Sequence, residues 1–205
     1  MAFMAESTAT RDRIVEATGQ LMRYQGYGAT SVKQIVDQAR VTTGSLYHFF
    51  PEGKRQVAAA ALQSTASAYI ALVPLLLDPH DDLGTAVRAF FGAAADDIER
   101  AGWATMCPVG TVAAEVADVE PQLRAVCADI VASWIADAET YFAGRGLARD
   151  DAHTLTVLAL TALEGAFVLG RTLHSAEPLL TAGETVAAAA EAMSRSAAAA
   201  CPTPR

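Results

Sequence analysis

Residues that carry catalysis, metal binding and disulfide bonding are scarce in this chain of 205 residues. Its three cysteines, Cys107, Cys127 and Cys201, are widely spaced without a CxxC motif, which argues against a secreted disulfide framework. The four histidines show no HExxH pattern, and the sequence has neither a phosphate-binding glycine loop nor a GxSxG motif. We therefore expect no catalytic site, no metal site and no cofactor, and we expect that the protein is not an enzyme.

The chain also lacks an apolar leader segment and a convincing membrane span. The N-terminal residues MAFMAESTATRD contain no apolar run of the kind found in signal peptides. Residues 56–77 carry no charge, but four polar residues between Gln63 and Ser67 and a proline at Pro74 interrupt the apolar run. This pattern favours a buried helix over a membrane span, so we expect a cytoplasmic protein without a membrane partner.

Apolar residues are abundant and aromatic residues are few. Apolar side chains make up 52% of the sequence and aromatic ones only 7%, because alanine supplies much of the apolar content. Alanine is the best helix former and a poor strand residue, and no segment shows the alternation typical of a strand. The sequence therefore predicts an all-α fold of about nine helices.

The helices are placed by their apolar periodicity and by the turn residues between them. Residues 1–9 are expected to form a loose tail. Thr30 or Ser31, Thr42, and Asp150 or Asp151 are the expected N-caps of three of the helices. The expected helices span about residues 10–25, 32–39, 42–50, 54–77, 83–100, a short segment opening at 107–110, 120–144, 150–173 and 183–199.

Charge is distributed unevenly along the chain, whose net charge is −8. Residues 1–55 contain seven Lys or Arg and five Asp or Glu, giving +2, whereas residues 56–205 contain eight and eighteen, giving −10. A mildly basic head on an acidic body suits an anionic partner at the N-terminal end. We predict an N-terminal domain over residues 1–53 and a C-terminal domain over residues 54–205.

The second and third expected helices form a helix-turn-helix pattern, because both are short and a tight turn joins them. Leu46 and Phe50 are four residues apart and point inward. Thr43, Tyr47 and His48 lie on the other sides, where hydroxyl groups and the imidazole ring can bond phosphate oxygens or base edges. Spacing alone leaves an alternative open, in which Tyr47 and His48 merely cover a small core.

The stretch from Thr10 to about Leu62 resembles the N-terminal domain of the TetR family of bacterial transcriptional regulators. The matching residues are Ile14, Ala17, the entry Gly26–Val32, Ile35, Ala39, Val41, the run Thr43–His48, Phe50 and Lys54. The segment SLYHFFPEGK, together with CPVG at Cys107–Gly110, resembles the branch typified by the lincomycin-resistance repressor and its flavonoid-responsive relatives.

The resemblance implies a homodimer whose third helices enter successive major grooves of a palindromic DNA operator. The implied DNA contacts are Thr42, Thr43, Gly44, Ser45, Tyr47 and His48, and the implied phosphate contacts are Ser31, Lys33 and Lys54. The sequence departs from the family pattern at four positions. Arg40 replaces a common glycine, Thr43 replaces a common lysine, and Phe49 follows His48 where a polar ring is common. Gly53 lengthens the segment between Phe50 and Lys54 by one residue.

The C-terminal part is expected to bind a small molecule and to form the dimer interface through its last two long helices, as the family architecture implies. The candidate ligand-binding residues are Phe90, Trp103, Met106, Cys107, Trp134, Phe167 and Arg171. Rings with a few polar groups suit an apolar or aromatic ligand, although any single ring is more often a core residue. Glu164, Arg171 and His174 share one face and could orient a ligand or form structural ion pairs.

The resulting hypothesis is a dimeric repressor that a small apolar or aromatic effector releases from a palindromic operator. The helix over 54–77 is expected to be the lever, because it alone joins the body to the head. One alternative is a redox-sensing regulator that uses Cys107, whose thiol would sit at a helix N-terminus. Another is a helical ligand- or protein-interaction module with a vestigial head.

Overall fold

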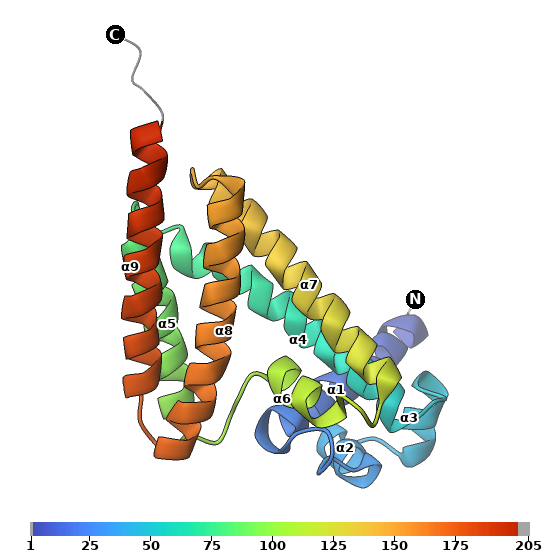
Figure 1. Cartoon of the computed structure of the whole chain (residues 1–205). Coiled ribbons are helices and arrows are strands. Elements are labelled where there is room, and N and C mark those ends of the chain that lie inside the picture. The colour runs from blue at the N-terminus through green and yellow to red at the C-terminus, as the bar shows by residue number, and fades with distance from the viewer. Residues whose placement is uncertain (1, 201–205) are drawn as a thin grey trace. The chain divides into compact units, whose positions relative to one another are not determined.

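The computed structural model describes residues 2–200, and among the side chains those of residues 7–199, so that Cys201 lies outside the described residues. Within this part the chain forms nine α-helices and no strand, which confirms the predicted all-α fold (Figure 1). The helices are α1 (Ala2–Gln25), α2 (Val32–Ala39), α3 (Thr43–Phe49), α4 (Lys54–Leu77), α5 (Leu83–Arg100), α6 (Pro108–Val116), α7 (Pro121–Gly144), α8 (Arg149–Leu173) and α9 (Glu177–Ala200).

Two helices begin earlier than the sequence predicts. The first helix starts at Ala2, so residues 2–9 continue α1 and do not form the expected loose tail. The last helix starts at Glu177, six residues before Gly183. Proline is tolerated in the first turn of a helix, so Pro178 does not delay the start of α9. Gly183 lies inside this helix and has a packing role there.

The predicted cap of α8 was wrong. Ala148 is the N-cap of α8 and makes no side-chain capping hydrogen bond. Asp150 and Asp151 both lie within the first turn of the helix. Carboxylates in a first turn interact favourably with the positive end of the helix dipole, so these residues stabilise the helix start without capping it.

The described chain divides into two compact units, and each unit combines two separate segments of the sequence. Unit 1 consists of residues 1–68 and 107–131, and unit 2 consists of residues 69–106 and 132–205. Unit 1 therefore holds α1, α2, α3 and α6 together with the first parts of α4 and α7. The boundary predicted between residues 53 and 54 falls inside unit 1, and as a division of function it stays a prediction.

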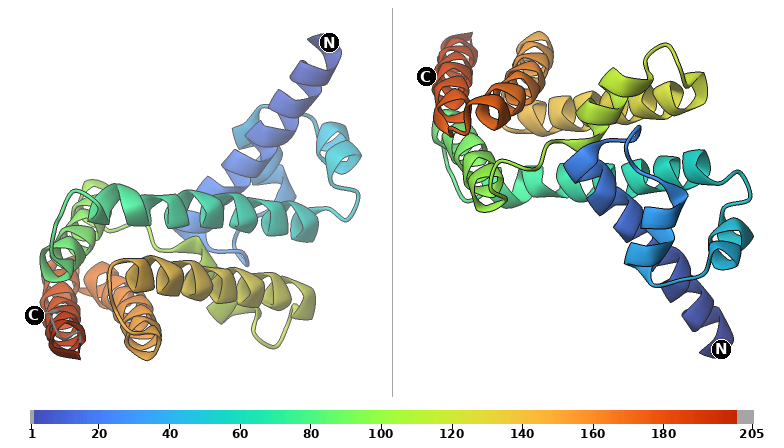
Figure 2. Two further views of the ribbon diagram at one scale, coloured as in Figure 1. Left: turned by 90° about the horizontal axis from the view of Figure 1, so that it is seen from above. Right: turned by 90° about the horizontal axis from the view of Figure 1, so that it is seen from below.

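Unit 1 is built around α1, which packs against α2, α3 and α6. Figure 2 shows the two short helices α2 and α3 beside α1. Apolar side chains from each of these helices and from the start of α4 and α7 supply its core. The fully buried members include Ile14, Met22, Ile35, Leu46, Val57, Leu62, Val109 and Leu123.

Unit 2 is built around α5, α8 and α9, which run side by side (Figure 1). Its core contains Phe91 and Ile98 from α5, Leu155 from α8, and Leu179 and Val186 from α9, all at most 1% exposed. The contact between α5 and α9 is the most extensive of the unit. Burial of apolar side chains between these helices is therefore the main source of stability in unit 2.

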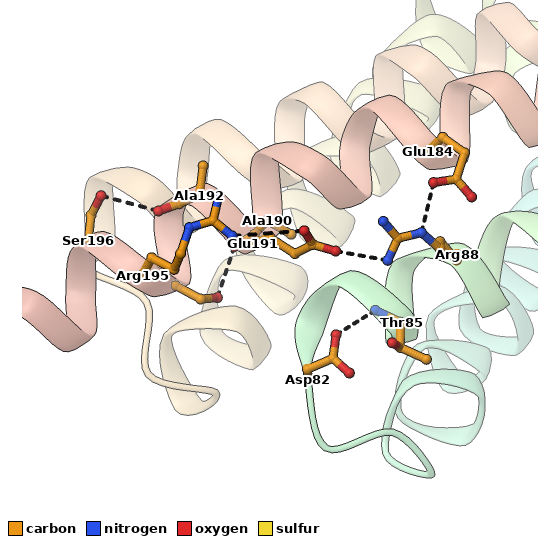
Figure 3. A network of polar contacts seen from close by, with 10 residues as sticks. Asp82, Thr85, Arg88, Glu184, Ala190, Glu191, Ala192, Arg195 and Ser196 are labelled. Carbon is orange, nitrogen blue, oxygen red and sulfur yellow. Dashed lines mark hydrogen bonds and ion pairs between the residues drawn. The ribbon is translucent and has the colours of Figure 1, made fainter.

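Glycine lets α5 and α9 approach closely. A Cβ atom at Gly183 would lie 2.6 Å from the Cβ of Phe91, which is too close for two carbon atoms. On the surface of the same contact, Arg88 of α5 donates to Glu184 and to Glu191 of α9, each at 2.8 Å (Figure 3). The pair of α5 and α9 thus combines a tight apolar contact with a bridging guanidinium group.

Two helices in the described part of the chain, α4 and α8, are long and apolar enough to cross a membrane by length and composition alone. Core and interface helices of soluble proteins pass the same test, so this finding is weak evidence for a membrane span. Pro74 lies inside α4 and interrupts its apolar run. The apolar side chains of these helices can be shielded from water by a protein core or by a protein partner as well as by lipid.

We predict that Gly183→Ala lowers the free energy of unfolding by about 1–3 kcal/mol, because the added methyl group overpacks the contact with Phe91. Gly92→Ala is the matched control, since Gly92 lies inside α5 and a Cβ there would meet nothing within 4 Å. We expect this control to be about 0.5–1 kcal/mol more stable than the parent. Chemical denaturation measures both values, and a Gly183→Ala variant as stable as the parent would contradict the prediction.

Candidate nucleic-acid interface

The start of α2 is fixed by a capping box. Ser31 accepts a hydrogen bond from the backbone N–H of Gln34 at 3.2 Å, and the Gln34 side chain accepts one from the Ser31 N–H at 2.8 Å. Thr30, the other predicted cap, is buried and donates to the Gly26 carbonyl at 2.7 Å. The Ser31 hydroxyl, a predicted phosphate contact, therefore already has a structural role at the start of α2.

The turn between α2 and α3 depends on a left-handed residue. Arg40 has φ 54° and ψ 49°, a conformation that residues with a Cβ atom rarely adopt. The Val41 N–H donates to the Val36 carbonyl at 3.0 Å and the Arg40 N–H to the Asp37 carbonyl at 3.3 Å. This is the hydrogen-bond pattern of a Schellman motif, in which glycine is the usual left-handed residue. The sequence departure at Arg40 thus corresponds to real backbone strain.

The inner side of α3 is anchored in the core of unit 1. Thr42 is the N-cap, as predicted, and its hydroxyl oxygen accepts from the Ser45 N–H at 3.1 Å. Leu46 and Phe50 are 0% and 2% exposed. The Phe50 N–H donates to the Leu46 carbonyl at 2.8 Å and closes the last turn. These contacts set the rotation of the helix about its own axis.

The opposite side of α3 faces solvent. Thr43, Gly44, Tyr47 and His48 are exposed, and the side chain of Tyr47 remains 47% accessible. A Cβ at Gly44 would meet only the Thr42 hydroxyl oxygen, at 3.7 Å, so nothing else covers the backbone there. The imidazole ring of His48 packs edge-on against Phe49, with 5.0 Å between the ring centroids. One continuous face therefore offers a hydroxyl, a phenol, an imidazole and bare backbone.

Two of the predicted contact hydroxyls are already hydrogen-bonded. The oxygens of Thr42 and Ser45 lie 2.9 Å apart, and Ser45 is only half-exposed. A hydroxyl group has one donor and two acceptor positions, so each can still bond one further group. The exposed face of α3 consequently depends mainly on Thr43, Tyr47 and His48.

The two predicted lysine contacts have intramolecular partners in this structure. Lys33 pairs with Asp37 at 2.6 Å on the exposed side of α2. Lys54 lies 4.1 Å from the ring centroid of Tyr27 and 3.4 Å from the Gly28 carbonyl oxygen. Burial lowers the pKa of Lys54, and the nearby carboxylates of α6 and the following loop act in the opposite direction. The Lys33 side chain remains 84% exposed beside its partner, whereas Lys54 is half-buried.

Sequence reasoning missed a residue that joins α6 to the head. The carboxylate of Glu115 accepts a hydrogen bond from the Gly28 N–H at 2.6 Å, although the two residues are 87 positions apart. The expectation that α4 alone connects the head to the rest of the chain was therefore wrong. No local pattern around Glu115 could have indicated this contact, because it depends on how α6 packs against α1.

The candidate ligand residues are not all brought together. Phe90, Trp103 and Phe167 pack against the core cluster of unit 2. Trp134 stacks on Tyr69, with ring centroids 6.3 Å apart. Met106 ends one segment of unit 2, whereas Cys107 begins a segment of unit 1.

Cys107 is the N-cap of α6 and is buried. A reactive thiol needs access to solvent as well as a favourable electrostatic environment. The burial of Cys107 does not favour the redox alternative.

The predicted shared face of Glu164, Arg171 and His174 is interrupted. Glu164 and Arg171 lie within α8 and are half-buried, but His174 is the residue that ends the helix, with φ 50°. Its ring stacks on Trp103, with centroids 6.2 Å apart and an angle of 12° between the planes. Trp103 also has a positive φ, of 64°. Two left-handed residues thus meet through their rings within unit 2.

Within the described part of the chain, no group of three or more His, Cys, Asp or Glu side chains could hold a metal ion. The polar groups of α3 instead match a surface that reads nucleic acid by hydrogen bonds. A seven-residue helix with its first turn open to solvent is also short enough to lie in a DNA major groove.

Comparison with known proteins identifies relatives that are transcriptional regulators. Residues 14–61 match the model for bacterial regulatory proteins of the tetR family, and residues 84–185 match the model for the C-terminal domain of LmrA/YxaF-like transcriptional regulators. The chain is 32% identical over 177 residues to the uncharacterized HTH-type transcriptional regulator YxaF of Bacillus subtilis, covering 86% of this chain and 93% of that protein. It is 27% identical to the regulator LmrA of the same organism, covering 83% and 91%.

Solved structures share the fold. The regulatory protein TetR from Rhodobacter sphaeroides superposes with a TM-score of 0.76 at 22% identity, covering 87% of this chain and 97% of that one. A TetR transcriptional regulator from Chloroflexus aurantiacus gives a TM-score of 0.70 at 27% identity, covering 90% and 95%. These relatives are regulators and not enzymes.

We predict that Arg40→Gly is about 0.5–1 kcal/mol more stable than Arg40→Ala. Both changes remove the guanidinium group, but only glycine adopts the left-handed conformation without strain, and the greater freedom of unfolded glycine offsets part of that gain. Thermal and chemical denaturation of the two variants measure the difference. Equal stability of the two would show that the backbone at this turn is not strained.

Proposed function

The chain belongs to the TetR family of bacterial transcriptional regulators, and on that premise we propose that it is a homodimeric repressor released from DNA by a small ligand. It is a DNA-binding regulator with an LmrA/YxaF-like C-terminal domain. Beyond this family assignment, we propose a dimer, a palindromic operator, the DNA-contacting residues, a cytoplasmic location and an apolar or aromatic effector. The observation that carries it is the exposed polar face of α3 above a fully buried anchor.

The geometry of α3 supports a role in reading bases. Leu46 and Phe50 are held in the core, so Thr43, Tyr47 and His48 are the side chains left to enter a major groove. A threonine hydroxyl, a phenol and an imidazole can each donate to or accept from base edges. Gly44 lets the sugar–phosphate backbone approach closely.

An exposed apolar stripe on α8 supports the homodimer. Val157, Leu158, Val168, Leu169 and Leu173 are between 36% and 63% exposed, and their helical spacing places them along one side of the helix. Exposed apolar side chains gathered on one side of a helix indicate an interaction site. A second copy of the same stripe would cover it by two-fold symmetry. Two recognition helices about 34–36 Å apart would then match half-sites one DNA turn apart.

The aromatic cluster of unit 2 supports an apolar or aromatic effector. Phe90, Trp103 and Phe167 are only partly buried where they pack against the core. A ligand that binds better when the heads are spaced wrongly for the operator weakens DNA binding by reciprocal linkage. The strained pair of Trp103 and His174 lies in the same unit and could change with the ligand.

A footprint of the purified protein on the DNA flanking its own gene tests the proposal. A protected palindrome would give the half-site spacing and an assay in which candidate effectors can be screened. A folded protein that protects no sequence there, and whose binding to DNA does not weaken as salt is raised, would contradict the proposed repressor.

We predict that Tyr47→Phe and His48→Ala each weaken binding to the protected palindrome by about 1–3 kcal/mol, because each removes a hydrogen bond to a base. The dependence of binding on salt should stay unchanged, since no phosphate contact is lost. Tyr24→Phe is the matched control, because Tyr24 is 53% exposed but lies on α1. Equilibrium titration of labelled operator measures the effect, and unchanged affinity in both α3 variants would remove these residues from the contact set.

We also predict that Leu169→Glu converts the dimer to a monomer, because the new carboxylate would face its symmetry mate in an apolar interface. Leu75→Glu is the control, since Leu75 is 66% exposed on α4 and Leu169 is 54% exposed on α8. Analytical ultracentrifugation reports the change directly. If Leu169→Glu remains dimeric at micromolar concentration, the α8 stripe is not the interface.

A further inference from the structure

Lys54 and Glu115 meet at one peptide group, that of Gly28. The Lys54 ammonium group donates to the Gly28 carbonyl oxygen at 3.4 Å, and the Gly28 N–H donates to the Glu115 carboxylate at 2.6 Å. The Lys54 ammonium also lies over the Tyr27 ring, 4.1 Å from its centroid. All four residues belong to unit 1, so this arrangement is a feature of a single compact unit.

The chain makes room for the Glu115 carboxylate at Gly26. This glycine has φ 77°, and a Cβ there would lie 2.8 Å from the carboxylate carbon of Glu115 and closer still to one of its oxygens. Any other residue would therefore push Glu115 away from the turn. The left-handed conformation and the absence of a side chain together admit an anion beside the Gly28 N–H.

The surrounding carboxylates favour the charged form of Lys54. Burial lowers the pKa of Lys54, while Glu115 and Glu120 both stabilise its charged form. The pKa of Tyr27 is raised by its burial and then by Glu120, so this second carboxylate also faces the cluster. Lys54 is thus a partly desolvated cation whose carboxylate neighbours come from α6 and from the loop after it.

Two other cations of residues 1–55 form ion pairs with carboxylates close by in the sequence. Lys33 binds Asp37 and Arg55 binds Glu52, each at 2.6 Å. Those partners lie four and three residues away in the sequence. Each of these ion pairs therefore stays together when its segment moves. Of these three cations, only Lys54 shares a bonding partner, the Gly28 peptide group, with a carboxylate distant in the sequence.

We propose that Glu115 is an intramolecular competitor of the DNA phosphate for Lys54, so that the position of α6 sets the affinity of the head for DNA. While Glu115 sits beside Gly28, Lys54 is drawn toward the turn between α1 and α2. When α6 withdraws, the ammonium group is free to bind a phosphate oxygen at the start of α4. The inference rests on the proposed DNA-binding role of the head.

The energetic basis is the exchange of one anion for another. A lysine that neutralises a phosphate releases condensed counterions, and this release appears as a steeper loss of affinity with salt. Lys54 contributes less of that dependence while it is held at the Gly28 carbonyl and attracted by the Glu115 carboxylate. The slope of log affinity against log salt therefore reports whether Lys54 is available to bind a phosphate. If Glu115 had a purely structural role, its substitution would leave this slope unchanged.

The test measures the binding of a duplex DNA of arbitrary sequence at several salt concentrations, so it needs neither the operator nor the effector. The variants are Glu115→Gln, Lys54→Ala and the two combined. Glutamine keeps an amide oxygen that can accept the Gly28 N–H while it removes the charge. Asp118→Asn is the control for net charge, because Asp118 is exposed between α6 and α7 and its loss changes the total charge equally.

We expect Glu115→Gln to bind DNA more tightly than the parent at low salt, with a slope steeper by about 0.9, which corresponds to one additional phosphate contact. The gain should disappear in the Lys54→Ala background, and Asp118→Asn should not reproduce it. Thermal denaturation checks that all variants remain folded.

Three results would overturn the inference. They are weaker binding by Glu115→Gln, a gain that persists without Lys54, and an equal gain in Asp118→Asn. A parent protein that shows no salt-dependent binding at all would instead contradict the proposed DNA-binding role itself. The failure of the inference and the failure of the proposed function therefore give different results in the same titration.

Discussion

The exposed polar face of α3 depends on the burial of Leu46 and Phe50 beneath it. A helix of seven residues is too short to be stable alone, because the hydrogen bonds of two turns do not offset the free-energy cost of nucleating the helix. The two buried side chains and the Thr42 cap supply what the helix lacks. The same contacts fix its rotation, so a substitution in the core of unit 1 would misdirect Tyr47 and His48 without touching DNA.

Local patterns were enough to predict most of the helices and the inner and outer faces of α3. Apolar spacing identifies Leu46 as buried, and the hydroxyl of Thr42 identifies the cap. The same reasoning failed at α8 and α9, where Asp150 looked like a cap and Gly183 like a helix start. Asp150 is a carboxylate in the first turn of α8, and Gly183 is the site where α9 comes close to Phe91.

What the sequence could not predict are contacts between segments distant in the chain. Glu115 reads as one exposed acid on a short helix, and only the packing of α6 against α1 brings it to Gly28. In the sequence, Gly26 and Gly28 indicate only the end of a helix. In the structure, Gly26 also leaves space for the Glu115 carboxylate. The ligand candidates have the same limitation, because aromatic residues in a sequence do not reveal which core they join.

The charge balance of the head has a consequence for specificity. Arg11, Lys33, Lys54 and Arg55 already have carboxylate neighbours, and the whole chain has a net charge of −8, which reduces its attraction to arbitrary DNA. Phosphate contacts raise affinity for every sequence alike, whereas the hydrogen bonds that we propose for Thr43, Tyr47 and His48 would discriminate between base pairs. A regulator with few free cations binds firmly only where those hydrogen bonds form. Restraining Lys54 therefore favours selective binding over tight binding, and freeing it would shift that balance.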